Sequence, residues 1–197
     1  MPGPAPKLVL ASRSPQRRAI LESLGVAFEV RPVDVLEEDE GAPVAVAAEN
    51  ALRKALAGKA RAGTARPEEV VLGVDTIVVT GLEIWGKPPN EEAARETLRR
   101  LAGRTHLVIS GVALVDEAGT VRADEAVTEV TFRPLDDAMI AWYLSSGEWD
   151  GRAGGYAIQG RGGALVERID GDYLNVVGLP VGTLLGLWPG LLDLAAA

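Results

Sequence analysis

Residues 70–80, VVLGVDTIVVT, limit the fold of this chain more than any other segment. Their short length and many β-branched residues predict a strand that is buried on both faces of a sheet. Asp75 lies in the middle of this apolar run, where a carboxylate is costly unless it is paired, hydrogen-bonded or metal-bound. Structural buried aspartates exist, but this placement favours a functional Asp75 with the Thr76 hydroxyl beside it. Gly73 indicates a bulge or the close approach of another backbone segment.

The N-terminal segment, residues 7–25, predicts a strand, a polar turn and a helix. Residues 8–11 form the short apolar strand. Ser14 fits the position of a helix N-cap, and Pro15 fits the first helical position, where its missing N–H is no loss. Apolar residues then recur on one helical face until Gly25, which ends the helix.

Two arginines in the first turn of that helix, Arg17 and Arg18, break the usual charge pattern. The positive end of the helix dipole disfavours cations there, and a local violation of this kind often marks a functional site. Free N–H groups, the hydroxyls of Ser12 and Ser14 and two guanidinium groups would together suit a phosphate. The alternative is that both arginines face solvent.

Periodicity and turn residues predict the other elements. Residues 43–62 carry an apolar stripe and predict a helix, which Gly63 and Pro67 would end. The pair Asp170-Gly171 predicts a hairpin between strands over 165–169 and 173–177. The other expected elements are strands over 28–33, 82–85, 106–115 and 121–132, and helices over 90–101, over 136–146 and starting at 178–180.

Further polar positions are candidates for a ligand site. Glu37 begins an acidic run, which is either a solvated loop or a source of oxygen ligands for a divalent cation. Lys54 flanks the apolar stripe of its helix, and this position alone does not distinguish a ligand-binding lysine from one that solvates the helix face. Lys87, between glycine and proline, is better fixed than a surface lysine and could face an anion. The glycine-rich residues 147–163 predict a pocket wall rather than a linker, and Gln159 within them could read the polar edge of a base.

Several catalytic groups are missing from the sequence. There is no cysteine, which excludes disulfides, thiolate catalysis and zinc–sulfur sites. His106 is the only histidine and begins a strand, so we expect a structural role for it and no Ser-His-Asp arrangement. A phosphotransferase is a weak alternative, because the chain has no Walker-type G-x-x-x-x-G-K-[ST] sequence.

Charge and hydropathy restrict the partners. The formal net charge of −8 argues against a broad nucleic-acid-binding face, so an anionic substrate would need a local cationic pocket. The N-terminus lacks the apolar core of a signal peptide, and no apolar run is long enough to span a bilayer. We therefore expect a soluble cytoplasmic protein, without a membrane or nucleic-acid partner, built as a single domain over residues 1–197.

Four segments cover nearly the whole chain in order: LASRSPQRRAIL; GVDTIVV followed by GKP; LRRLAGRTHLVISGVAL; and AGGYAIQGRGGALVERIDGDYLNVVGLP. They resemble the signatures of the Maf family of nucleoside triphosphate pyrophosphatases, which read LASxSPRRxEL, GADTxV with GKP, LxxLSGxxHxVxTGV and AGAYGIQGxGAxxVxxIxGDYxxVVGLP. Four ordered segments are far more specific than any one of them.

The resemblance implies a mixed α/β fold with a twisted sheet, flanking helices and two lobes around a central cleft. It implies a hydrolase acting on acid anhydrides, which converts a nucleoside triphosphate to the monophosphate and pyrophosphate. It also implies a divalent cation, Mg²⁺ or Mn²⁺, and a homodimer. The pair Thr76 and Gln159 resembles the branch of the family that acts on dTTP and UTP.

The resemblance also implies the roles of site residues. Asp75 matches the proton acceptor and Glu37 its acidic partner, and either carboxylate could hold the metal. The expected substrate-binding residues are Ser12, Ser14, Gln16, Arg17, Lys54, Thr76, Lys87 and Gln159. Two positions depart from the family pattern. Gln16 replaces an arginine that helps to set specificity, and Gly151-Arg152 replaces the usual Asp-Lys, with Asp150 one residue earlier.

A second hypothesis comes from a different class of protein. Members of this family have been associated with inhibition of septum formation, so the chain could be a nucleotide-binding regulator of cell division that needs no turnover. The complete set of Lys54, Asp75 and Lys87 argues against a purely binding role.

Overall fold

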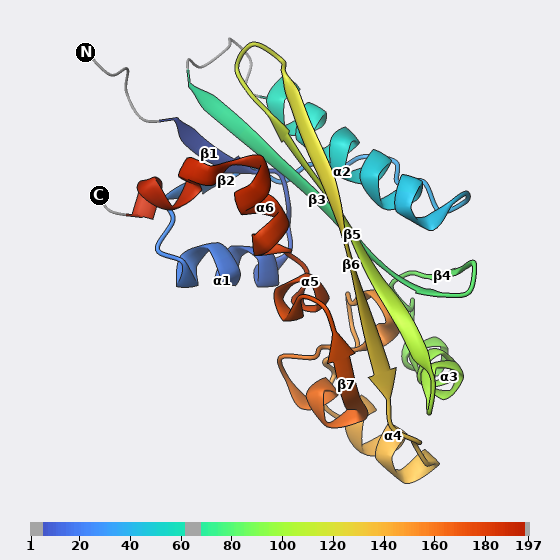
Figure 1. Ribbon diagram of the computed structural model, residues 1–197. Coiled ribbons are helices and arrows are strands. Elements are labelled where there is room, and N and C mark those ends of the chain that lie inside the picture. Colours follow the sequence, from blue (N-terminus) through green and yellow to red (C-terminus); the bar gives the residue numbers. More distant parts are fainter. Residues whose placement is uncertain (1–5, 62–67, 196–197) are drawn as a thin grey trace.

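A sheet with three long central strands dominates Figure 1, a computed structural model that describes residues 6–61 and 68–195. The strands β3, β5 and β6 are antiparallel neighbours, whereas β1 runs parallel to both β2 and β3. The described residues form one seven-stranded mixed sheet in the order β2-β1-β3-β5-β6-β7, with β4 paired to β3. The strand bounds are β1 Lys7–Leu10, β2 Phe28–Val30, β3 Glu69–Thr80, β4 Glu83–Trp85, β5 Thr105–Val115, β6 Val121–Phe132 and β7 Val166–Asp170.

Helices flank this sheet, which confirms the expected mixed α/β fold (Figure 1). Their bounds are α1 Pro15–Ser23, α2 Pro43–Ala60, α3 Glu91–Leu101, α4 Asp137–Leu144, α5 Tyr173–Val177 and α6 Val181–Leu187, with 3₁₀ segments at Ala153–Gly155, Arg161–Leu165 and Pro189–Ala195. Most expected elements are confirmed with small shifts at their ends. However, β2 ends at Val30 rather than at residue 33. The expected end signals of α2, Gly63 and Pro67, lie outside the described residues.

The helix α2 lies directly on β3 and β5, and two glycines make this contact possible. A Cβ atom added at Gly73 would lie 2.1 Å from the carbonyl oxygen of Ala51, and one added at Gly111 would lie 2.3 Å from that of Ala47. Gly73 therefore marks a close backbone approach, one of the two expected alternatives. The close contact brings the polar side chains of α2 against the middle of β3.

Two buried clusters cover the opposite face of the sheet. Their members on β3 have even numbers, because side chains alternate across a strand. Val74 belongs to the first cluster and Val78 to the second, and Thr76 lies between them on the same face. The first cluster joins β1, α1, α6 and the first half of β3. The second joins α3, α4 and the ends of β3, β5 and β6.

The segment after β7 corrects the sequence analysis. Residues 173–177 form the helix α5 rather than a strand, so the expected hairpin at Asp170-Gly171 is wrong. The Asp172 side chain caps this helix by accepting the backbone N–H of Leu174 at 2.7 Å. Buried Asn175 then donates from Nδ2 to the carbonyl oxygen of Val108 at 3.0 Å and to the Thr128 hydroxyl at 3.0 Å. These bonds fix a short helix where the Asp170-Gly171 turn signal had suggested the second strand of a hairpin.

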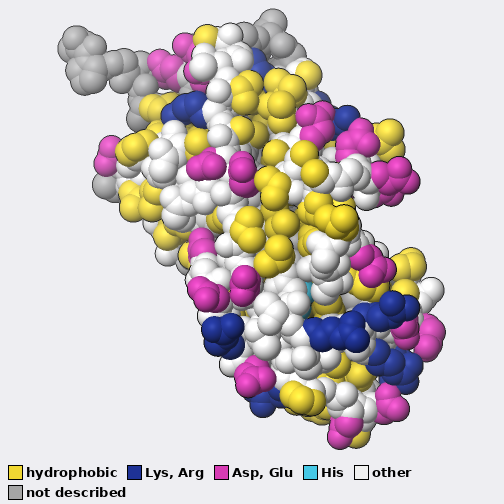
Figure 2. Space-filling model, turned by 45° about the vertical axis from the view of Figure 1, so that its right-hand side comes forward, with side chains coloured by type: hydrophobic (Ala, Val, Ile, Leu, Met, Phe, Trp, Pro, Cys, Tyr) yellow, Lys and Arg dark blue, Asp and Glu magenta, His cyan; other side chains and the backbone are white. Residues whose placement is uncertain are grey.

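Figure 2 shows hydrophobic side chains gathered along the middle of one face of the molecule. The exposed large hydrophobic residues of α2 are Val44 and Leu56, and those of β6 are Val121 and Val127. None of the helices in residues 6–61 and 68–195 is long and apolar enough to cross a membrane.

Candidate active site

A pocket of about 420 Å³ lies next to the middle of β3. β1 pairs with β3 as far as Leu72 and β4 pairs from Val78, so within the described residues the edge of β3 between them has no paired strand on this side. The two buried clusters lie on either side of this gap. The predicted residues that line the pocket are Ser12, Ser14, Gln16, Arg17, Glu37, Lys54, Thr76, Lys87 and Gln159. The structure therefore brings together side chains from six separate parts of the sequence.

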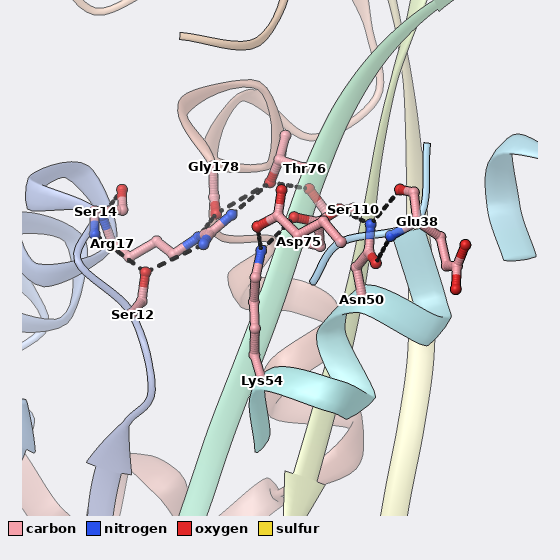
Figure 3. Close-up of polar contacts among 11 residues, drawn as sticks. Ser12, Ser14, Arg17, Glu38, Asn50, Lys54, Asp75, Thr76, Ser110 and Gly178 are labelled. Atoms are coloured by element: carbon pink, nitrogen blue, oxygen red, sulfur yellow. Dashed lines mark hydrogen bonds and ion pairs between the residues drawn. The ribbon is translucent and has the colours of Figure 1, made fainter. Parts of the chain in front are cut away.

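Asp75 lies deeper, behind the side chain of Lys54. Its own side chain is 9% exposed and points from β3 toward α2. Lys54 Nζ lies 2.6 Å from Asp75 Oδ1, and Asn50 Nδ2 donates to Asp75 Oδ2 at 3.2 Å (Figure 3). The carboxylate in the apolar strand is thus paired and hydrogen-bonded, as its burial requires.

The carboxylates of Glu37 and Asp75 both pair with the ammonium group of Lys54. Lys54 Nζ lies 2.6 Å from Glu37 Oε1 as well as 2.6 Å from Asp75 Oδ1. Two carboxylates that converge on one positive charge provide the hard oxygen ligands that Mg²⁺ and Mn²⁺ prefer, and Mg²⁺ commonly takes its other ligands from water and substrate phosphates. No group of three or more Asp, Glu, His or Cys side chains in the described part of the chain could hold a metal alone. This two-carboxylate arrangement therefore fits a metal that is shared with a phosphate ligand.

Asn50 is a site residue that the sequence analysis missed. It is 1% exposed, and besides Asp75 it contacts both the N–H and the carbonyl group of the Glu38 backbone. Its Oδ1 accepts the Glu38 N–H at 2.8 Å and its Nδ2 donates to the Glu38 carbonyl oxygen at 2.9 Å. The sequence shows only a lone amide in an Ala-rich helix, which does not by itself indicate a site residue.

Arg17 points into the pocket, whereas Arg18 faces solvent and pairs with Glu22. The Arg17 guanidinium donates from Nε to the carbonyl oxygen of Gly178 at 2.8 Å, from Nη1 to Ser12 Oγ at 3.2 Å and from Nη2 to Thr76 Oγ1 at 3.1 Å (Figure 3). Burial lowers the pKa of Arg17, and the negative charges of Asp75 and Glu37 offset part of that change. These bonds use three of its five N–H groups, leaving two without a bond among the described residues.

The two serines of the N-terminal turn shape the start of α1. Ser14 is the N-cap, as expected, and its Oγ accepts the Arg17 N–H at 3.4 Å. It also donates to Gln16 Oε1 at 3.1 Å. Ser12 Oγ accepts the backbone N–H of Ser14 at 3.1 Å. The turn therefore fixes Arg17 by its backbone and by its side chain.

Thr76 is held by a second residue that the sequence analysis missed. Ser110 on β5 is fully buried, and its Oγ lies 2.8 Å from Thr76 Oγ1. Ser110 reads in the sequence as part of an ordinary strand, so only the pairing of Thr76 with Ser110 in the sheet reveals this contact. The pocket is apolar beyond Thr76, where Val78, Val108 and Tyr156 line it.

Two cations of the pocket wall, Lys87 and Arg152, form no ion pair with the described residues. Arg17 also forms no ion pair with any described residue, because its side chain donates to neutral oxygens, whereas the two remaining lining cations are neutralised locally. Arg13 pairs with Asp34, and Lys54 is held by two carboxylates. Arg152 Nε is buried and has no hydrogen-bond partner in the described part of the chain. An anion in the pocket would therefore meet charge that the protein itself leaves uncompensated.

His106 lies under the pocket wall rather than in the pocket lining. Its Nε2 lies 2.9 Å from the Tyr156 hydroxyl, and its ring packs edge-on against Phe132 and Tyr156. Burial lowers the pKa of His106 from 6.5 to about 4, so the ring is neutral at pH 7. The geometry is that of a packed, structural histidine.

Comparison with known proteins identifies the family. The family model for Maf-like proteins matches residues 7–188. The chain belongs to the Maf family. This confirms the resemblance that the four ordered segments carried.

Maf relatives match this chain over most of their length. A dTTP/UTP pyrophosphatase from Gloeobacter violaceus is 46% identical over 92% of this chain and 94% of that protein. One from Anaeromyxobacter dehalogenans is 48% identical over 90% of both chains, and one from Pyrococcus furiosus is 40% identical over 92% and 93%. A solved HAM1 protein from Coxiella burnetii has a TM-score of 0.46 and 19% identity, over 64% of this chain and 73% of that one, a similarity too low to bear on function.

Proposed function

We propose that this protein hydrolyses nucleoside triphosphates, dTTP and UTP first among them, to the monophosphate and pyrophosphate. The observation that carries the proposal is the Lys54-bonded Asp75 beside a pocket with uncompensated cations. The names of the relatives that are 40–48% identical over most of the chain support it.

The reaction follows from these groups. Water attacks the α-phosphorus, the bond from this phosphorus to the bridging oxygen breaks, and pyrophosphate leaves. One proton of the water passes to Asp75, whose carboxylate oxygens each keep a free lone pair beside their present bonds. Arg17, Lys87 and Arg152 donate to phosphate oxygens and stabilise the charge that develops on pyrophosphate.

Glu37 and Asp75 would hold the divalent cation together with the phosphates. When bound, the metal neutralises phosphate charge and lowers the pKa of water. The protein residues supply the geometry, since Lys54 already keeps both carboxylates within hydrogen-bond distance of one point.

Gln16, Thr76 and Gln159 contribute the selection of the base. An amide can pair with the O4 and N3–H edge of uracil or thymine as donor and acceptor at once. A site built for that edge leaves buried polar groups unpaired when another base enters, which discriminates strongly. Gln16 bonds to Ser14 in the same pocket and replaces an arginine of the family pattern, so it can relax this preference.

A panel of triphosphates tests the proposal. Pyrophosphate release from dTTP, UTP, CTP, GTP and ATP is measured with Mg²⁺ and with Mn²⁺, and kcat/KM is compared. We expect dTTP and UTP to have the highest ratios. A purine triphosphate as the best substrate would contradict the role of Thr76 and Gln159 and direct attention to Gln16. Nucleotide binding without release from any triphosphate would favour the regulator of septum formation.

The same proposal includes a cytoplasmic homodimer in which residues 1–197 fold as one domain. Light scattering coupled to size exclusion tests the assembly, with twice the mass of the chain as the expected result. A monomer that retains full turnover would remove the homodimer from the proposal and leave the activity.

A further inference from the structure

One buried amide, that of Asn50, joins the acidic segment to the central strand. All of its bonding capacity but one lone pair is used within the protein. Oδ1 accepts the Glu38 N–H at 2.8 Å, and the two hydrogens of Nδ2 go to the Glu38 carbonyl oxygen at 2.9 Å and to Asp75 Oδ2 at 3.2 Å (Figure 3). The side chain is fully enclosed, so these bonds are shielded from competing water.

The segment that Asn50 holds is the one that carries Glu37. Two further side chains of α2 contact the same segment. Arg53 donates to the carbonyl oxygen of Leu36 at 3.1 Å and pairs with Glu38 Oε1 at 2.6 Å, and Lys54 pairs with Glu37. Positions three and four apart lie on one face of a helix, so Asn50, Arg53 and Lys54 together face residues 36–38.

Asn50 differs from Arg53 in what it connects. Arg53 is 34% exposed and contacts the acidic segment without reaching Asp75, and an exposed ion pair adds little stability. Asn50 contacts Glu38 and Asp75 at the same time. The position needs one acceptor and two donors from a short side chain, which an amide provides and a carboxylate or an alkyl group does not.

We propose that Asn50 is a positioning residue for the reaction. It fixes the acidic segment to the carboxylate of Asp75, so that Glu37 and Asp75 stay within reach of one cation. This inference rests on the proposed pyrophosphatase activity for its kinetic consequence. Its structural consequence is independent of that activity.

Amide hydrogen exchange, measured by NMR on protein free of metal and substrate, tests the structural part. In the unmodified chain, we expect the Glu38 amide to exchange much more slowly than those of Asp39 and Glu40. Asn50→Ala should abolish this protection, because the acceptor is lost. Asn50→Asp keeps an acceptor for the Glu38 N–H, but its second oxygen faces the Glu38 carbonyl oxygen and Asp75, so protection should be only partly retained. Rapid exchange of the Glu38 amide in the unmodified protein would overturn the proposal without any variant.

Kinetics test the link to Asp75. Both variants lose the donor to Asp75 Oδ2, so kcat should fall about tenfold or more while KM changes less than about threefold, since a misplacement of about 1 Å can cost about 100-fold in rate. Glu49→Gln is the matched control, because Glu49 is the neighbouring residue and bonds only to Arg53 on the surface. It should leave kcat unchanged.

The outcomes separate the two proposals. Asn50→Asp that folds and retains the kcat of the unmodified enzyme overturns the positioning role, even if its melting temperature falls. If the unmodified protein releases no pyrophosphate from any triphosphate, the proposed function fails. The exchange pattern of the Glu38 amide then still decides whether Asn50 holds the segment.

Discussion

At the scale of single residues, Asp75 is the group whose role can be tested most directly. Asp75→Asn keeps the shape of the side chain but cannot accept the proton of water, and it pairs poorly with Lys54. We expect turnover of dTTP with Mg²⁺ to be lost, while the circular dichroism spectrum stays unchanged. Near-normal turnover would remove Asp75 from the mechanism.

Arg17 and Arg18 are adjacent in sequence and opposite in environment, which makes them a matched pair. Arg17→Ala removes a guanidinium with two N–H groups still available to substrate. The transition state should lose about 2 kcal/mol of stabilisation, so kcat/KM should fall roughly 30-fold. Arg18→Ala removes an exposed pair with Glu22 and should change kcat/KM little. Thermal unfolding of both variants checks that Arg17→Ala remains folded. Equal small effects would mean that the start of α1 is not the phosphate site.

At the scale of elements, the contact between α2 and the sheet links stability to activity. Gly111→Ala would introduce a Cβ atom 2.3 Å from the Ala47 carbonyl oxygen, so α2 must move away from β5. Overpacking of this kind typically costs about 1–3 kcal/mol. We expect a lower midpoint in urea and a lower kcat, because α2 carries Asn50 and Lys54.

The control for this prediction is Gly186→Ala in α6. A Cβ atom at Gly186 meets no atom within 4 Å. Alanine favours a helix interior over glycine by up to about 1 kcal/mol, so the midpoint should stay or rise. A loss in Gly186→Ala as large as that in Gly111→Ala would mean that the close helix–sheet contact is not the cause.

The elements differ in how well the sequence predicts them, for physical reasons. Strand β3 and the start of α1 are predicted because local chemistry decides them: β-branched residues in one, and a Ser14 cap with Pro15 in the other. Residues 173–177 were predicted as a strand because Asp170-Gly171 is a hairpin turn signal, whereas the Asp172 cap and the contacts of Asn175 decide the structure of helix α5. A pattern in a five-residue segment cannot report contacts made with distant strands.

Site residues divide in the same way. Charged or polar residues in unusual places, such as Asp75 in an apolar strand and Arg17 in a first helical turn, are visible in the sequence. Asn50 and Ser110 are not, because their importance comes from the partners that the fold places opposite them. The separation of Arg17 from Arg18 likewise depends on the direction in which α1 faces the sheet.

At the scale of the whole molecule, burial of the single histidine makes stability depend on pH. In the unfolded chain the pKa of His106 is near 6.5, whereas in the folded protein burial lowers this pKa to about 4. Between these values the unfolded state binds more protons than the folded state. The free energy of unfolding therefore rises with pH in this window and falls on acidification.

The size of this effect can be measured with a variant that does not titrate. The interval between pH 6.5 and about 4 corresponds to about 3 kcal/mol for a group as buried as His106. His106→Gln retains a donor and an acceptor for the Tyr156 hydroxyl but cannot be charged. Urea unfolding of both proteins at pH 4, 5, 6 and 7 should show the unmodified chain losing about 3 kcal/mol more than the variant between pH 7 and pH 4. Parallel pH profiles would contradict this, because they would mean that the buried ring accepts its proton as readily as the unfolded one.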